Sequence, residues 1–202
     1  MARLAVEERR ALLLQAAARV IARVGVSDAT TRAIADEAGM SQGAFHYCFR
    51  SKDELLRQML TDLLDHLDRR ARNALDATRT SASAGAALRD GLRTLWSELA
   101  SRENENLVLY ELTVVALRSP ELNDLPAQQY ERYFSIMEQF LRDVAERWNI
   151  TWTRPVERLA RFAVAGIDGL GLSWLVTRDD DTVTGVLHDI ACHLQEHAAP
   201  AP

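Results

Sequence analysis

Cysteine, proline and glycine are all scarce in this chain of 202 residues, which has 2 Cys, 5 Pro and 9 Gly. Cys48 and Cys192 lie far apart and form no C-x-x-C pair. Neither a disulfide framework nor a zinc finger is therefore expected, and a reducing cytoplasm is favoured. Apolar–polar alternation of the kind found in strands is almost absent, whereas patterns with a period of 3.6 residues dominate. The sequence therefore predicts an all-α fold.

Long apolar runs and catalytic signatures are also missing. The longest apolar tract, FAVAGIDGLGLSWLV, contains an Asp and three Gly, so no membrane span is expected. The N-terminus, MARLAVEERRALLL, lacks the pattern of a secretion signal. There is no G-x-S-x-G, H-E-x-x-H or P-loop, and GIDGLGL follows no strand, which argues against a phosphate loop. We therefore expect no enzyme, no cofactor and no metal site.

The charge is unevenly placed along the chain. The formal net charge is −5, yet residues 1–50 hold seven Arg and five acids, a balance of +2, which leaves −7 for residues 51–202. Hydrophobic residues make up 48% of the chain, enough for one or two domains with a real core. A basic head on an acidic body permits contact with a polyanion at one end.

About nine helices follow from the periodicity and the capping residues. The first runs over 6–24 with Gly25 as its C-cap. A second is opened by Thr30 or Thr31 and ends at Gly39, and Ser41 caps a third over about 42–48. The S-K-D-E box at residue 51 opens a long fourth helix over about 52–76.

The body continues the helical pattern. Further helices are expected at about 86–101, 104–118, 121–148, 155–177 and 182–197, and the terminal AAPAP is expected to fray.

The third helix carries an unusual outward face. At 100° per residue, Phe45, Cys48 and Phe49 fall on the buried side. The opposite side and its flanks carry small residues together with Gln, His and Tyr, where a solvated helix would carry Lys and Glu. Such a surface suits close approach to another large body. Its residues are Gln42, Gly43, Ala44, His46 and Tyr47.

The run TTRAIADEAGMSQGAFHYCFRSKDELL resembles the TetR family of bacterial transcriptional repressors. Gly39 fits the turn of a helix-turn-helix, and Ala35 lies four residues before it, where a small side chain lets the two helices touch. The motif covers about a quarter of the chain, and the rest fits in length, helical content and a glycine-containing penultimate helix. The plainer alternative is a pair of short bundle helices.

The resemblance implies a set of DNA contacts. Thr31, with Arg32 beside it, would bind phosphate at the start of the second helix. Gln42 would read a base edge such as adenine, while Gly43 and Ala44 face the major groove. The remaining implied contacts to backbone or bases are Ser41, His46, Tyr47 and Lys52.

Two positions depart from the family pattern. Cys48 stands where the family usually has His, and His46 stands where it often has Tyr. The phosphate contact of that Tyr and the operator sequence therefore do not transfer. Cys48 is expected to be a small buried hydrophobic residue, and the alternative is a redox-sensing thiol.

The resemblance also implies two domains and a dimer. Residues 1–52 would be the helix-turn-helix DNA-binding domain and 53–202 the ligand-binding and dimerisation bundle. The helices at about 155–177 and 182–197 would pack against their twins to form a homodimer on a pseudo-palindromic operator. The protein would then be a cytoplasmic, nucleoid-associated bacterial regulator released from DNA by a small molecule.

Candidate residues for the effector pocket are bulky aromatics and acids within apolar runs. An acid among Leu and Val must be paired or meet a cationic or hydrogen-bonding ligand. The alternative is ordinary core packing for the rings and a rim or interface position for the acids. The set is Trp96, Tyr110, Glu111, Tyr133, Phe140, Phe162, Asp168 and Trp174.

Other functions stay open at this stage. His188 with Cys192, and His193 with His197, have the i, i+4 spacing of metal ligands but no evident third ligand. The rival functions are an enzyme or carrier built on the helical body, and a helical adaptor that binds protein rather than DNA.

Overall fold

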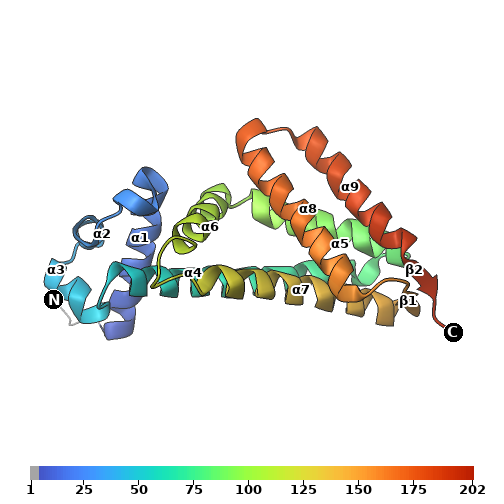
Figure 1. Cartoon of the computed structure of the whole chain (residues 1–202), viewed down its shortest axis with the longest axis horizontal. Helices are drawn as coiled ribbons and strands as arrows, with labels where there is room; N and C mark the ends of the chain where they lie inside the picture. The colour runs from blue at the N-terminus through green and yellow to red at the C-terminus, as the bar shows by residue number, and fades with distance from the viewer. Residues whose placement is uncertain (1–4) are drawn as a thin grey trace. The chain divides into compact units, whose positions relative to one another are not determined.

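The structure, a computed structural model, describes residues 5–202, except for the side chains at positions 75, 77 and 79. Over this part of the chain the fold is all-α, as predicted, with nine α-helices and two short strands (Figure 1). The helices are α1 (Val6–Asp28), α2 (Thr31–Glu37), α3 (Gln42–Cys48), α4 (Lys52–Ala77), α5 (Ala84–Ala100), α6 (Glu103–Ala116), α7 (Leu125–Arg147), α8 (Val156–Thr177) and α9 (Asp180–Glu196).

The chain divides into two compact units whose boundaries fall inside or at the ends of helices. Unit 1 comprises residues 1–64 and 104–128, and unit 2 comprises residues 65–103 and 129–202. Unit 1 therefore holds the three N-terminal helices, the first half of α4 and nearly all of α6. The predicted division at residue 52 is a functional one and stays a prediction.

A glycine bends the first helix. Gly25 adopts a φ of +82°, which glycine reaches without the steric cost of a Cβ, and the chain then stays helical to Asp28. The predicted C-cap is therefore an internal kink, and α1 ends four residues later than expected. The bend turns Val26 into the interior, where it is buried.

The two short helices begin at the predicted caps. The hydroxyl of Thr30 accepts the Ala33 N–H at 3.1 Å, so Thr30 rather than Thr31 is the N-cap of α2. Gly39 adopts a φ of +66° in the turn between α2 and α3. The Ser41 hydroxyl then caps α3 by accepting the Ala44 N–H at 3.2 Å.

The start of α4 shows half of the predicted capping box. The Ser51 hydroxyl accepts the Glu54 N–H at 3.1 Å, as expected. The Glu54 carboxylate accepts the N–H of Arg50 at 2.8 Å rather than that of Ser51. The bond from the Glu54 carboxylate back to the start of the helix therefore reaches one residue further than in a standard capping box.

Helix α7 begins at Leu125 rather than at the predicted residue 121. Arg57 donates two hydrogen bonds to the Asp124 carboxylate, at 2.7 and 2.9 Å, and one to the Glu121 carbonyl at 2.6 Å. These contacts hold residues 119–124 in turns, with Leu122 buried beneath them. The helix therefore starts only after this segment.

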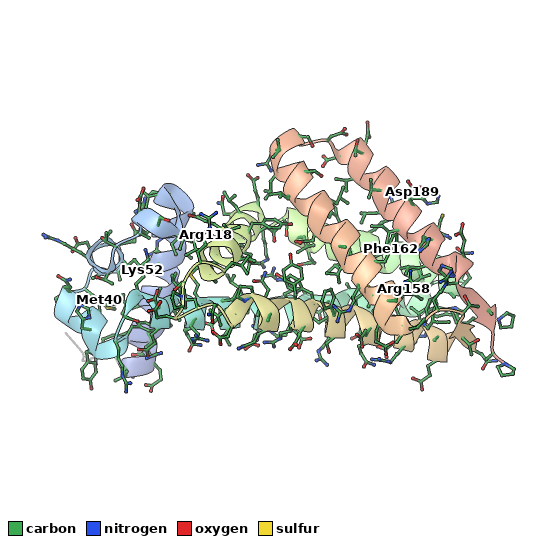
Figure 2. The ribbon with its side chains drawn as sticks, in the orientation of Figure 1. Met40, Lys52, Arg118, Arg158, Phe162 and Asp189 are labelled. Carbon is green, nitrogen blue, oxygen red and sulfur yellow. The ribbon has the colours of Figure 1, made fainter. Side chains whose placement is uncertain are left out.

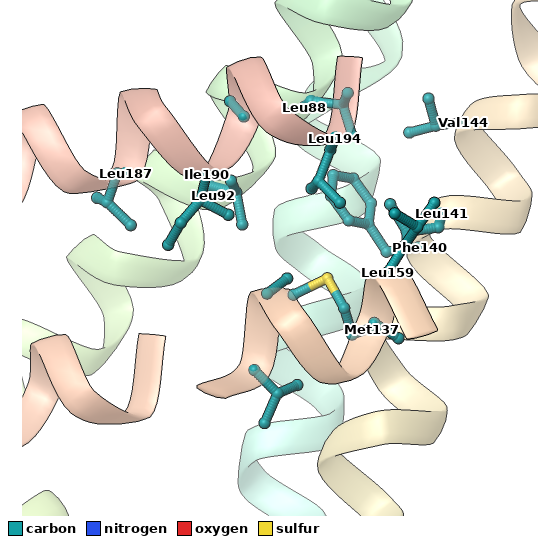
Figure 3. Close-up of a cluster of buried hydrophobic side chains, with 14 of the residues drawn as sticks. Leu88, Leu92, Met137, Phe140, Leu141, Val144, Leu159, Leu187, Ile190 and Leu194 are labelled. Carbon is teal, nitrogen blue, oxygen red and sulfur yellow. The ribbon is translucent and has the colours of Figure 1, made fainter. Parts of the chain in front are cut away.

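The core of unit 2 lies between four helices. Figure 3 shows Leu88 and Leu92 of α5, Met137, Phe140, Leu141 and Val144 of α7, Leu159 of α8, and Leu187, Ile190 and Leu194 of α9 in one apolar cluster. Close packing of α8 on α9 depends on Gly166, since a Cβ there would lie 2.8 Å from Ile190 Cδ1. The helical periodicity of these segments predicts this cluster well.

The end of the chain is paired rather than frayed. Strand β1 (Ile150–Trp152) forms an antiparallel pair with β2 (Ala198–Pro200), and Thr151 lies opposite Ala199. The expectation for AAPAP is therefore wrong for its first three residues, because β1 offers free backbone groups that the sequence pattern does not reveal. The Trp152 indole anchors this pair by donating to the Leu141 carbonyl at 3.0 Å.

Helix α8 carries large apolar side chains outside the core. Within the described residues it is long and apolar enough to cross a membrane by length and composition, although 28% of that stretch is buried in the fold. Its exposed apolar side chains include Phe162, Leu172 and Val176. This face calls for a covering surface.

Candidate nucleic-acid interface

The prediction of which side of α3 is buried and which is exposed is confirmed. Phe45 and Phe49 are fully buried and Cys48 is nearly so, while the Tyr47 side chain is 64% exposed. Phe45 anchors the helix against the head, with its ring 5.9 Å from that of Phe49. The outward surface consists of Gln42, Gly43, His46 and Tyr47, which are exposed, and Ala44, which is half-buried.

No packing requirement within unit 1 explains the glycine on this surface. A Cβ added to Gly43 would meet only the Ser41 hydroxyl oxygen, at 3.8 Å, which is an ordinary contact. The backbone at Gly43 lies in a regular helix and needs no special φ. The small residue therefore leaves room on the outer side of α3.

The start of α2 presents two further predicted contact residues. Since Thr30 caps the helix, Thr31 is its first helical residue and is half-buried. Arg32 is strongly exposed and lies 3.9 Å from the Asp36 carboxylate, at the outer limit of an ion pair. Both side chains remain accessible to a ligand outside the chain.

Lys52 is engaged within the fold. Its ammonium donates to the carbonyl of Val26 at 2.5 Å and to that of Ser27 at 3.2 Å. Burial lowers the pKa of Lys52, against the opposing influence of nearby acids led by Asp53. Lys52 is half-buried at the start of α4, where Figure 2 labels it. The predicted phosphate contact stays a prediction.

Glu111 of α6 contacts the same backbone segment as Lys52. Its carboxylate accepts the Val26 N–H at 2.5 Å, and a Cβ at Gly25 would lie 2.8 Å from that oxygen. Glu111 and Lys52 therefore hold the N–H and the carbonyl of one residue, Val26, directly after the kink in α1. Sequence reasoning placed Glu111 in an effector pocket because the acid lies in an apolar run; its partner is a backbone group in unit 1.

Several arginines of the head connect elements of the fold. Arg19 and Arg23 both pair with Glu37, at 2.8 and 2.9 Å, and thereby join α1 to α2. These hydrogen bonds lower the pKa of Glu37. Arg9 and Arg10, which sequence reasoning did not single out, contact the α3 end of the head.

In unit 2 the structure brings Tyr133 and Asp168 into one cluster through Tyr130. The Tyr130 hydroxyl donates to the Asp168 carboxylate, and its ring lies 5.6 Å from that of Tyr133. Burial and then Asp168 raise the pKa of Tyr130 to about 12. Burial also raises the pKa of Tyr133, whose hydroxyl oxygen accepts from Gln129 at 2.8 Å.

The other predicted pocket residues are scattered. Trp96 and Trp174 contact edge to face at 5.8 Å. Phe162 is exposed on α8 and lies 4.3 Å from the His193 ring, and Tyr110 belongs to unit 1 with Glu111. The eight residues therefore do not form a single site.

Phe140 does line a groove in unit 2. The groove is shallow, with a cavity volume of about 20 Å³, and its lining is almost entirely apolar. Small residues create the room on one side. The lining consists of Ala71, Ala74, Gly91, Leu92, Leu95, Ile136, Met137 and Phe140.

Cys192 and the C-terminal histidines contact one another two at a time. Cys48 is buried and Cys192 half-buried, and Cys192 Sγ lies 3.4 Å from His188 Nε2. His193 and His197 contact edge to face at 4.9 Å. Within the part of the chain that the structure describes, no group of three His, Cys, Asp or Glu is placed to hold a metal ion.

Known families and proteins match both parts of the chain. Residues 13–59 match the family described as bacterial regulatory proteins, tetR family, and residues 88–199 match the C-terminal part of BetI-type transcriptional repressors. The nicotine-responsive transcriptional repressor HdnoR of Paenarthrobacter nicotinovorans is 31% identical over 178 residues, which cover 88% of this chain and 89% of that protein.

Solved structures share the fold. A transcriptional regulator from Rhodococcus sp. Rha1 superposes with a TM-score of 0.76 at 23% identity, covering 96% of this chain and 99% of that one. A putative TetR-family regulator from Mesorhizobium loti reaches a TM-score of 0.81 at 15% identity, covering 98% and 100%. With the family matches and the exposed face of α3, the conclusion is that this chain belongs to the TetR family of bacterial transcriptional regulators.

Proposed function

We propose that this protein is a transcriptional repressor that binds operator DNA through α3 and releases it when a small molecule binds unit 2. One observation carries the DNA-binding part: α3 buries Phe45 and presents an exposed face of Gln42, Gly43, His46 and Tyr47, in which no packing contact requires the glycine. An α-helix fits the major groove of B-DNA, where base edges are distinguishable. Such a repressor acts in the bacterial cytoplasm, where the chromosome lies.

The residues of this face take different roles. Gln42 reads a base edge, and adenine is the partner that its amide matches best. Gly43 and Ala44 let the helix backbone approach the bases. His46 and Tyr47, with Ser41, Thr31, Arg32 and Lys52 around them, are proposed as contacts to phosphates or bases; for Lys52 this contact would compete with its bonds to the α1 carbonyls.

A matched pair of variants tests the DNA contact. Gln42→Ala removes the proposed base reader, whereas Gln15→Ala removes an exposed glutamine from α1 in the same unit. We expect Gln42→Ala to weaken binding to the DNA upstream of this gene by about 1–3 kcal/mol, while Gln15→Ala leaves it unchanged. The measurement is fluorescence anisotropy with labelled duplex. If the wild-type chain ignores that DNA but captures a protein partner, the alternative of a helical adaptor replaces this proposal.

The exposed apolar face of α8 supports a homodimer through α8 and α9. Val176 is 79% exposed, Leu172 52% and Phe162 43%, which is unusual for side chains of this size in a soluble helix. Gly169 of α8 and Gly185 of α9 are exposed, and a Cβ at either would meet no atom within 4 Å. A second copy packing closely on these helices accounts for both observations.

The dimer is tested by sedimentation velocity. Leu172→Glu places a charge on the apolar face and is expected to give monomers at micromolar concentration. Thr184→Glu places a charge on the exposed surface of α9 and shows whether α9 takes part in the interface as well as α8. A dimer that survives both changes would contradict this interface.

The groove in unit 2 is the proposed effector site. Its lining of small and aliphatic residues around Phe140 suits an apolar portion of a ligand. HdnoR, the relative named above, is nicotine-responsive, and another relative in fold, FadR of Bacillus subtilis, was crystallised with stearoyl-CoA. Small-molecule control is therefore proposed for this chain too. A ligand acts only if it binds the free and the DNA-bound states with different affinity.

The effector site is tested by filling the groove. Ala74→Leu should abolish the rise in melting temperature that an effective ligand from a metabolite library produces, while DNA binding by the unliganded protein persists. Loss of DNA binding together with the ligand response would show a folding defect instead.

A further inference from the structure

Two neighbouring arginines of α1 contact α3 in contrasting ways. The Arg10 guanidinium lies 4.2 Å from the centre of the Phe49 ring, donates to the Cys48 carbonyl and forms a 3.6 Å ion pair with Glu54. Arg10 thus joins three parts of the head and has its charge balanced. It is a structural residue.

Arg9 lies over the ring of Tyr47 instead. Its guanidinium carbon is 5.3 Å from the ring centre, within the range of a cation–π contact. Tyr47 is an exposed aromatic residue of the outward α3 face. The stack therefore brings a side chain of α1 to the surface that α3 offers to DNA.

Arg9 differs in its partners from Arg10, Arg19 and Arg23. In the part of the chain that the structure describes, Arg9 forms no ion pair, and its Nε is buried without a hydrogen-bond partner. Arg19 and Arg23, by contrast, share Glu37. The Nε atom is closed to solvent, whereas the two terminal nitrogens of the guanidinium are not among the buried unpaired atoms. These terminal nitrogens are the atoms that can donate to an external anion.

We propose that Arg9 grips a phosphate of the operator backbone beside α3, with the Tyr47 ring as the platform that orients it. The inference rests on the proposed DNA-binding function and adds a contact from outside the helix-turn-helix. Guanidinium presents a planar fork that matches phosphate oxygens, and stacking on an aromatic ring restricts its rotamers before binding. Tyr47 then acts as a positioning residue as well as a contact.

The test compares two duplexes and a range of salt concentrations. Arg9→Gln is titrated against the DNA upstream of this gene and against a random-sequence duplex of the same length. A phosphate contact is blind to sequence, so we expect both affinities to fall by a similar factor, about tenfold per head. The slope of log K against log salt should become shallower by about one per head.

Charge-matched and ring variants complete the design. Arg118→Gln removes an exposed arginine after α6, away from Met40 at the α2–α3 turn (Figure 2), and should leave the slope unchanged. Arg9→Lys should keep the slope but lose part of the affinity, because the ammonium cannot stack or fork. Tyr47→Phe should keep the Arg9 effect, whereas Tyr47→Leu should reduce it in a double-mutant cycle.

The outcomes separate this inference from the function beneath it. Wild-type protein that binds neither duplex would remove the proposed function. Wild-type protein that binds, with an unchanged salt slope in Arg9→Gln, would overturn the role of Arg9 alone. A loss confined to the upstream duplex would also overturn it, because that pattern marks a base contact.

Discussion

Unit 1 and unit 2 hold their helices together by different means. In unit 1, charged side chains reach the backbone of another element: Lys52 and Glu111 hold the two sides of Val26, and Arg57 holds the Glu121 carbonyl. In unit 2, four helices share one apolar cluster (Figure 3). The head therefore adds to its own buried core a few directional contacts, each of which leaves a partner unsatisfied when removed. The body spreads its stability over many small ones.

Two acids that look alike in the sequence show the same contrast. Glu111 and Asp168 both stand in apolar runs, and both were candidates for a ligand pocket. Glu111 accepts a hydrogen bond from a backbone N–H at a kink. Asp168 instead accepts a hydrogen bond from the Tyr130 hydroxyl on a neighbouring helix. An acid in an apolar run thus indicates a partner, but the sequence does not say which.

The largest expected effect comes from the ring that anchors α3. Phe45→Ala should lower the free energy of unfolding of unit 1 by about 3–5 kcal/mol, because the side chain is fully buried. Hydrogen exchange of amides in α1–α3 measures this loss. All four tryptophans lie in unit 2, so their fluorescence follows the body in the same sample. A loss below about 1 kcal/mol would contradict the burial of Phe45.

The next effect distinguishes the two acids. Glu111→Ala should cost unit 1 about 1–3 kcal/mol, because the Val26 N–H loses its acceptor in a buried setting. Asp168→Asn keeps an acceptor for the Tyr130 hydroxyl and should cost unit 2 less, about 1 kcal/mol. Urea unfolding, followed by hydrogen exchange for the head and fluorescence for the body, gives both values. The reverse order would break the comparison.

Alkaline pH should produce a smaller effect of opposite sign in the two units. The pKa of Tyr130 is raised to about 12, so the folded body retains a proton that the unfolded chain loses near pH 10, and stability falls as pH rises from 10 towards 12. The pKa of Lys52 is lowered, so the folded head releases its proton first and this residue's contribution to stability rises as pH approaches 10.5.

Variants at these two residues provide the check. Tyr130→Phe should make the alkaline decline of unit 2 less steep, with the remainder due to Tyr133, and Lys52→Met should remove the rise in unit 1. Unfolding curves collected at several pH values measure both. A decline that is equally steep in Tyr130→Phe would show that Tyr130 is not its source.

Local patterns predicted most of the fold. Helix positions followed from the spacing of apolar residues, and Thr30, Gly39 and Ser41 followed from capping and turn chemistry. The buried and exposed sides of α3 followed from the helical period alone. Contacts between residues distant in the sequence could not be predicted. Nothing in the sequence links Glu111 to Val26, or Arg9 to Tyr47, because each pair meets only through the tertiary fold. The late start of α7 and the pairing of β1 with β2 could not be predicted for the same reason.

Gly43→Ala tests the central claim, that the outer side of α3 lies against DNA, most directly. The added methyl group meets open space within the protein, so the free energy of unfolding should stay the same or rise by up to about 1 kcal/mol, since Ala favours helix. Affinity for the upstream DNA should nevertheless fall at least about tenfold, because the methyl group would occupy space that the groove needs. Equal affinity for DNA in the variant and the wild type would contradict the account.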